Sequence, residues 1–310
     1  MCKKPEIEIT SPPKVNNLLY WLAGALILPI NKLRHVIEGY TTPRTFGITE
    51  FDRAVDYDLS VVNSWKSYLD FYMGEPTSIN GKAILELGPG ADLGVGVLLT
   101  AYGARKYNSL DVNNLVKSVP DELYNTLFDR ISNTLKDPAV TVDELKKQLE
   151  LTKQGNNDKI NYICDKTFNL NNFKDEGIDL VFSQAAFEHF DNIPETFSQL
   201  SKIVQPNCVL VAEIDLSTHT RWIRDSDPNN IYRYPDWFYN ICKFLGSPNR
   251  MRPYEYKNIL ENLGWKNVQI IPRICLSSSY VEQSKSGMAR KFSGTENQMD
   301  QLSVILCATR

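Results

Sequence analysis

The hydrophobic positions of this chain fall into short apolar runs separated by longer stretches with helical spacing. The short runs are typical of strands buried on both faces of a parallel sheet, and they lie at residues 83–87, 106–111, 160–164, 178–182 and 209–214. The intervening helical spacing is clearest at residues 93–101, 123–135 and 254–263. Two more strand-like runs, at residues 265–274 and 302–308, close the chain. This alternation predicts an α/β protein.

The first strand-like run ends in a glycine turn. Gly88 and Gly90 let the backbone turn sharply and leave room for a ligand, and Asp92 can cap the helix that follows. The next run ends at Asp111, about twenty residues beyond the glycines, where a carboxylate can accept both hydroxyl protons of an adenosine ribose. The pattern therefore predicts a nucleoside site.

The residues around this turn argue against a dinucleotide. Leu93 stands where the pyrophosphate-binding fingerprint has a third glycine. The acids Glu86 and Asp92 flank the turn, and they would repel an anion but attract a cation. A nucleoside that carries a positive charge fits better.

Several segments resemble class I S-adenosylmethionine (SAM)-dependent methyltransferases. Glu86-Leu87-Gly88-Pro89-Gly90 resembles their first motif, and Asp111 resembles their ribose-binding acid. Residues 179–189 resemble their fourth strand and its exit. Residues 200–211 resemble their helix, proline turn and fifth strand, although Asn207-Cys208 replaces the usual Gly-Gly.

The resemblance implies a Rossmann-like α/β fold with a seven-stranded mixed sheet, strand order 3-2-1-4-5-7-6, the last strand antiparallel and helices on both faces. Residues 1–80 would hold a loose N-terminal arm, an apolar helix and a helical lid. Residues 81–310 would form the SAM-binding domain, with the inserts 113–159 and 216–252 as the cap over the acceptor. The lid is expected at residues 40–72, although its aromatic residues are equally consistent with ordinary core.

The resemblance also implies the residues that bind SAM. Asp165 would meet the adenine amino group, with capping of a helix as its alternative role, and Ser183 and Gln184 would meet the methionine half. The full expected set is Glu86, Gly88, Pro89, Gly90, Asp111, Val112, Asp165, Lys166, Ser183, Gln184 and His189. No metal is expected.

Composition narrows the partners and the compartment. The net charge of −3 provides no basic field for nucleic acid, so a small-molecule acceptor is expected. The six cysteines are scattered without metal-ligand spacing, which favours reduced thiols in a cytoplasmic protein.

Residues 18–30 form an apolar run that is too short for a membrane span, which needs about twenty residues. We expect a helix that packs on the catalytic domain or against a second subunit in a homodimer. Attachment to a membrane surface is the less favoured alternative.

Methyl transfer from a sulfonium is an in-line displacement, and an acceptor hydroxyl or ring nitrogen benefits from a general base. Of the three histidines, His219 is the favoured base, since it follows the fifth strand, whereas His35 is expected on the surface. His189, Asp215 and Tyr232 are the other catalytic candidates.

A narrower resemblance concerns the acceptor. Ile214-Asp215-Leu216-x-x-His219, the aromatic segment 232–237 and Asn249-Arg250 resemble a bacterial subgroup found in polysaccharide and natural-product clusters. The expected reaction is methylation of an oxygen or nitrogen atom on a secondary metabolite or sugar.

Two alternative functions remain open at this point. A nicotinamide-dependent oxidoreductase is disfavoured by Leu93 and by the lack of a suitably placed Tyr-x-x-x-Lys pair. An inactive, methyltransferase-like binding protein is disfavoured by the intact Gly88, Gly90 and Asp111.

Overall fold

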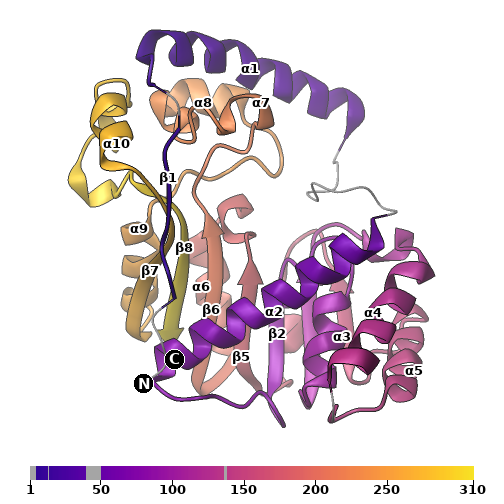
Figure 1. The fold of residues 1–310 in the computed structure, drawn as a ribbon. Coiled ribbons are helices and arrows are strands. Elements are labelled where there is room, and N and C mark those ends of the chain that lie inside the picture. Colours follow the sequence, from indigo (N-terminus) through magenta and orange to yellow (C-terminus); the bar gives the residue numbers. More distant parts are fainter. Residues whose placement is uncertain (1–4, 13, 40–49, 136–137) are drawn as a thin grey trace.

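The computed structural model describes residues 5–12, 14–39, 50–135 and 138–310, and within them eight strands form one sheet (Figure 1). The strands are β1 (Glu8–Thr10), β2 (Ala83–Leu87), β3 (Lys106–Asp111), β4 (Ile160–Cys164), β5 (Ile178–Gln184), β6 (Val204–Asp215), β7 (Lys266–Leu276) and β8 (Gln301–Thr309). The α-helices of the same residues are α1 (Asn17–Glu38), α2 (Phe51–Met73), α3 (Gly94–Ala101), α4 (Asp121–Thr134), α5 (Val142–Lys153), α6 (Ile193–Ile203), α7 (Arg221–Arg224), α8 (Asp236–Cys242), α9 (Pro253–Asn262) and α10 (Ser278–Lys285).

The strand order is β1-β7-β8-β6-β5-β2-β3-β4. Read without β1, it is the predicted order of the seven strands, and β8 is antiparallel to both of its neighbours. The eighth strand corrects the expectation of a loose N-terminal arm, because Glu8–Thr10 pairs in parallel with the edge of β7. Its three residues form hydrogen bonds with backbone groups of β7 that would otherwise be exposed at the edge of the sheet. A strand of three residues is too short to leave a periodic pattern in the sequence.

Asn207 explains why the usual Gly-Gly can be missing after the proline. Its φ of 66° lies in the left-handed region, where asparagine is tolerated better than most non-glycine residues. Its N–H donates to the carbonyl of Arg310 at 3.0 Å. Asn207 lies inside β6, where the register with β5 shifts between Val204 and Val209, so the expected turn is an irregularity within a continuous strand.

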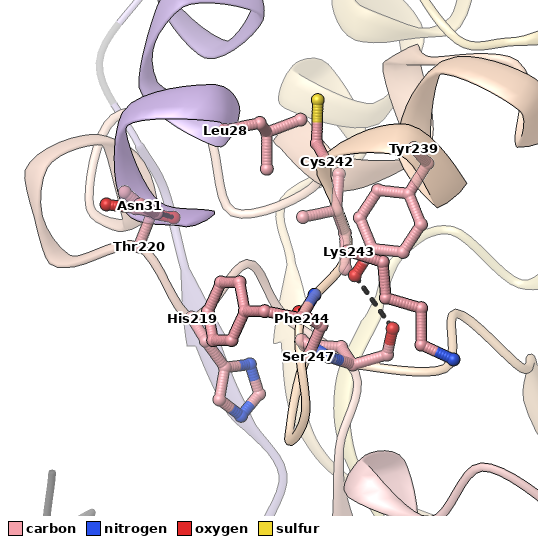
Figure 2. Close-up of a pocket in the computed structure, with 11 residues that line it drawn as sticks. Leu28, Asn31, His219, Thr220, Tyr239, Cys242, Lys243, Phe244 and Ser247 are labelled. Carbon is pink, nitrogen blue, oxygen red and sulfur yellow. Dashed lines mark hydrogen bonds between the residues drawn. The ribbon is translucent and has the colours of Figure 1, made fainter. Parts of the chain in front are cut away.

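The cap over one end of the sheet consists of α1 and the insert 216–252 (Figure 1). The helix extends beyond the predicted residues 18–30. It meets the insert through Gly24, where a Cβ would lie 2.2 Å from the Tyr234 hydroxyl, and through Asn31, which donates to Thr220 Oγ1 at 2.8 Å (Figure 2). The other insert, residues 113–159, was also expected in the cap. Its helices α4 and α5 instead pack against α2 and α3. The division of the chain into domains stays a prediction.

A buried ion pair fastens the cap together. Arg233 donates to Asp227 with Nε to Oδ2 at 2.6 Å, and both side chains are fully buried. The same arginine donates to Asn17 Oδ1 at 2.8 Å, and the Tyr280 hydroxyl donates to Asp227 Oδ1 at 2.5 Å. Asn17 in turn donates to the carbonyl of Gln283 at 2.9 Å. The network joins α1, the insert and α10.

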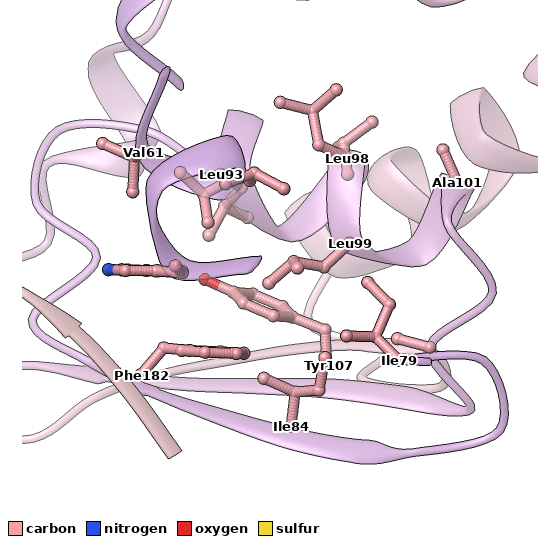
Figure 3. Packing of buried hydrophobic residues seen from close by; sticks show 14 of the residues in the cluster. Val61, Ile79, Ile84, Leu93, Leu98, Leu99, Ala101, Tyr107 and Phe182 are labelled. Carbon is pink, nitrogen blue, oxygen red and sulfur yellow. The ribbon is translucent and has the colours of Figure 1, made fainter. Parts of the chain in front are cut away.

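Helices cover both faces of the sheet, as predicted. On one face, α2 lies across the strands, and its Trp65 stacks on Phe182 of β5 with ring centroids 4.7 Å apart (Figure 1). Leu98, Leu99 and Tyr107 fill the space between α3 and the same face (Figure 3). On the other face, α6 and α9 pack over the strands. Trp65, Tyr68 and Tyr72 of α2 are thus core, whereas Tyr57 is exposed. Residues 40–49 of the expected lid lie outside the described residues.

The outer face of α1 is apolar and exposed. Only Gly24 and Leu28 of this helix are buried. The exposed apolar side chains are Leu18, Leu19, Trp21, Leu22, Leu26, Ile30, Leu33, Val36 and Ile37. No helix among the described residues has the length and apolar character needed to cross a membrane.

We expect protein, and not lipid, to cover this face. Helices that lie in a membrane surface carry a strongly basic polar face. The opposite face of α1 instead packs on the insert, and Arg34 pairs with Glu38 at 2.6 Å. The purified protein should therefore stay with the soluble fraction in flotation with anionic liposomes at physiological salt. Flotation of the parent but not of a Leu22→Glu, Leu26→Glu variant would contradict this expectation.

Candidate functional site

The predicted site residues meet at one edge of the sheet. β2, β3, β4, β5 and β6 run parallel, so their carboxyl ends lie together. The register pairs Leu87 with Leu110 and Asp111 with Cys164, which places the glycine turn beside the ribose acid. In open α/β sheets this edge is where ligands bind.

The glycine turn has the geometry that its sequence predicts. Gly88 and Gly90 have φ of 75° and 77°, in the left-handed region that favours glycine. A Cβ on Gly88 would also lie only 2.7 Å from the Cβ of Ala186. Pro89, between the two glycines, is half-buried.

Asp111 ties this turn to the end of β3. Its Oδ2 accepts from the Gly90 N–H at 3.3 Å, and its Oδ1 accepts from the Asn113 N–H at 2.8 Å. Burial raises the pKa of the carboxyl, and the backbone hydrogen bonds partly offset that rise. Val112 follows it and is half-buried.

Below the turn lies a buried acid. Glu86 accepts a hydrogen bond from the Tyr107 hydroxyl at 2.5 Å. Burial, with smaller contributions from Asp58 and Asp111, raises the pKa of Glu86 to about 8, although the Tyr107 hydrogen bond opposes the rise. Sequence reasoning missed Asp58, which is buried on α2 next to Gly94, because the apolar stripe of that helix dominates its pattern.

The end of β5 offers an acceptor to a ligand. Ser183 donates to the carbonyl of Leu87 at 2.9 Å, so its hydroxyl proton is in use. Gln184 donates through Nε2 to Glu213 at 2.8 Å, while its buried Oε1 has no hydrogen-bond partner among the described residues. The unpartnered buried oxygen of Gln184, the Asp111 carboxyl group and the two glycines of the turn together fit a cationic nucleoside such as SAM.

Asp165 and Lys166 lie on the loop after β4. Asp165 accepts from the N–H and the hydroxyl of Thr167, each at 2.8 Å, and these bonds lower the pKa of its carboxyl. It therefore organises its own loop, a local structural role close to the capping alternative. Lys166 donates to Asn113 Oδ1 at 3.1 Å and so joins this loop to the one that follows Asp111.

A second cluster contains Glu188, His189 and His219. The two imidazole rings meet edge to face with centroids 4.7 Å apart, and His219 Nε2 lies 3.8 Å from Glu188 Oε1. Glu188 is 2% exposed, and neither of its carboxylate oxygens has a hydrogen-bond partner among the described residues. Sequence reasoning weighed the two histidines separately and left Glu188 out of the site, although an acid four residues after the end of a buried strand was a usable signal.

The environment favours different protonation states for the two histidines. Burial would lower the pKa of His219, but the Glu188 and Asp215 carboxylates outweigh burial and raise it. Burial also acts on His189, and there it prevails and lowers the pKa.

Two of the catalytic candidates have structural roles. Tyr232 is fully buried in the insert and donates its hydroxyl proton to the carbonyl of Leu216 at 2.7 Å. Asp215 pairs with Arg224 at 2.6 Å and accepts from Ser217. Burial would raise the pKa of Asp215, but His219 and Arg224 outweigh it and lower the pKa. We therefore remove Tyr232 and Asp215 from the candidate bases.

His219 lines a cavity of about 90 Å³ between α1 and the insert (Figure 2). Leu28 and Asn31 of α1 lie on one side, and Tyr239 and Phe244 of the insert lie on the other. Residues 40–72 were expected to cover this cavity. The described part of that segment, α2, packs in the core instead, and α1 covers the cavity. An apolar cavity of roughly 150 Å³ holds benzene, so this one has room only for the reacting end of an acceptor.

Comparison with known proteins supports the enzyme class. Residues 129–212, from α4 into β6, match the family model of the methyltransferase domain. The match covers part of the chain and indicates a SAM-dependent methyltransferase. The match begins beyond the glycine turn and Asp111, so those residues support the family independently of it. SAM is the cofactor of this methyltransferase.

Solved structures show similar folds at low identity. The CurJ carbon methyltransferase is 14% identical, with a TM-score of 0.47 over 93% of this chain and 66% of that one. A methyltransferase from Mesorhizobium loti is 12% identical, with a TM-score of 0.44 over 80% and 100%. Phosphoethanolamine N-methyltransferase 2 from Haemonchus contortus, in complex with SAM, is 12% identical, with a TM-score of 0.44 over 82% and 52%. This chain thus spans about two thirds of the length of the CurJ methyltransferase and about half of the length of the Haemonchus contortus enzyme. No curated protein matches the sequence.

Replacing Asp111 tests the cofactor site. Asp111→Ala should weaken SAM binding by about 1.5–3 kcal/mol, because charged acceptors of the ribose hydroxyls are lost. Calorimetry with SAM and with NAD(P)H provides the measurement, and circular dichroism checks that the variant is folded. Unchanged SAM affinity in a folded variant, or tight NAD(P)H binding by the parent, would contradict the placement.

Glu86 predicts a pH dependence of stability. The folded protein keeps its proton up to about pH 8, whereas an ordinary glutamate loses it near 4.5. Between these values the native state binds more protons than the unfolded chain, so the free energy of unfolding falls as the pH rises.

Glu86→Gln should remove this fall, since glutamine still accepts from Tyr107 but cannot ionise. At about pH 8.5 the variant should exceed the parent in free energy of unfolding by on the order of a few kcal/mol, each pKa unit being about 1.4 kcal/mol. Urea denaturation at about pH 5 and about pH 8.5 measures the difference. The same pH dependence in both proteins would show that Glu86 is not the group responsible.

Proposed function

We propose that this methyltransferase transfers the methyl group of SAM to an oxygen or nitrogen atom of a small-molecule acceptor of secondary-metabolite or sugar type. We propose further that removal of the acceptor's proton depends on His219. The observation that carries the proposal is the position of this histidine. It lies at the carboxyl edge of the sheet, in contact with a buried carboxylate on one side and lining the cavity below α1 on the other.

The chemistry of the cavity supports a small acceptor. Its walls combine apolar groups, such as Leu28 and Phe244, with the polar Asn31, Thr220 and Ser247. Its size suits one polar group of a ligand. The net charge of −3 offers no attraction to a nucleic-acid backbone.

The protonation state of His219 supports an acceptor whose reacting oxygen or nitrogen atom carries a proton. His219 donates from Nδ1 to the carbonyl of Ser217 at 2.9 Å, because a carbonyl can only accept. In the neutral ring the lone pair is then on Nε2, the atom 3.8 Å from Glu188. A lone pair held beside a buried carboxylate suits withdrawal of a proton from a hydroxyl or an amine.

His219→Ala should lower kcat at least about a hundredfold while leaving SAM affinity nearly unchanged, as expected when a group acts only in the chemical step. The acceptor is first found by incubating the enzyme with methyl-labelled SAM and metabolite extracts. Single-turnover rates and calorimetry with SAM are then measured for the parent and the variant. Full turnover by the variant would contradict the role of His219, and labelling of protein or nucleic acid alone would contradict the acceptor class.

A further inference from the structure

The cluster of Glu188, His189 and His219 brings several lone pairs together, and no donor among the described residues forms a hydrogen bond to the Glu188 carboxylate. One atom from each side chain, an oxygen of Glu188 and a ring nitrogen of each histidine, lies within 4.8 Å of the other two. Both oxygens of Glu188 are buried and have no partner among the described residues. Burying an unpartnered carboxylate is costly, and a cation removes that cost.

The backbone fixes which nitrogen of each neutral histidine carries the lone pair. His189 donates from Nδ1 to the carbonyl of Gly246 at 2.6 Å, and His219 donates from Nδ1 to the carbonyl of Ser217 at 2.9 Å. Since the carbonyls can only accept, each neutral ring presents its lone pair on Nε2. A ring N–H that donates to a backbone carbonyl is the usual outer-shell support of a histidine that binds a metal.

We propose that Glu188, His189 and His219 bind one divalent transition-metal cation such as Zn²⁺. Two imidazoles and one carboxylate form a common ligand set for catalytic zinc, which keeps a further position open. Tetrahedral ligands of zinc lie roughly 3.3 Å apart, given bonds of about 2.0–2.1 Å. The 3.8 Å between His219 Nε2 and Glu188 Oε1 therefore needs to close by only about half an ångström.

The role of the cation rests on the proposed function. Its open position would take the oxygen or nitrogen of the acceptor and lower the pKa of the proton on that atom. The proton leaves to water, the freed lone pair bonds to the methyl carbon, and the carbon–sulfur bond breaks with its electrons kept on sulfur, giving S-adenosylhomocysteine. In this role His219 Nε2 binds the cation and does not itself take the proton, and the reaction still depends on this residue.

The test uses the full-length protein and the metal alone. After treatment with a chelator and its removal, Zn²⁺ is titrated by calorimetry and Co²⁺ by its visible absorption. We expect one equivalent per chain and a Co²⁺ spectrum with nitrogen and oxygen ligands. Glu188→Gln, His189→Ala and His219→Ala should each weaken Zn²⁺ binding more than about a hundredfold, because loss of even an outer-shell partner costs roughly 10–100-fold.

His35→Ala is the matched control, since it removes the third histidine of the chain, which stacks on Phe244. It should keep Zn²⁺ binding at the parent's level. His35→Ala, Glu188→Gln and His219→Ala should keep their SAM affinity, and all four variants should keep their circular dichroism. The proposal would be overturned if the parent did not bind Zn²⁺ stoichiometrically. It would also be overturned if the three cluster variants bound Zn²⁺ as tightly as the parent. Full turnover by the chelated parent together with an inactive His219→Ala variant would also overturn it, yet would leave the proposed function standing.

Discussion

The structure depends on a contact between two backbone segments at the end of β2. Gly88 approaches Ala186 so closely that a Cβ would lie 2.7 Å from the alanine's own Cβ. This contact sets the glycine turn, which is predicted to hold the cofactor, directly against the segment that leaves β5 and continues into Glu188 and His189. The cofactor site and the histidine cluster are thus held in one fixed relation by the sheet itself. Transfer of a methyl group needs this, because the reaction is sensitive to small errors in alignment.

The acceptor side is built differently. α1 covers the insert through a glycine and a few polar contacts, and its outer face remains exposed. The side chain of His219 belongs both to this cap and to the cluster at the sheet edge. In the proposed function, the sheet would set the position of the methyl group and the cap would select the acceptor.

Much of this arrangement could be predicted from the sequence, because the glycine turn and the acid at the end of β3 follow from local chemistry. The strand order followed from a resemblance carried by ordered motifs. The expected turn at Asn207 is instead an irregularity within β6, with φ in the left-handed region. The roles of Tyr232 and Asp215 could not be predicted, because a hydroxyl bonded to a distant carbonyl and a carboxylate paired with Arg224 depend on tertiary partners. Glu188 was overlooked for a related reason, since its burial and its lack of a partner are properties of the folded chain alone.

The ion pair of Arg233 and Asp227 has a consequence for the order of folding. Arg233 also forms a hydrogen bond with Asn17, near the start of the chain, and Asp227 forms one with Tyr280, near its end. On a ribosome, α1 emerges first but has to wait for almost the whole chain before these partners exist. The cofactor half, built from neighbouring strands and helices, has no such delay. The acceptor cavity is therefore expected to form last, in a nascent enzyme already able to hold its cofactor.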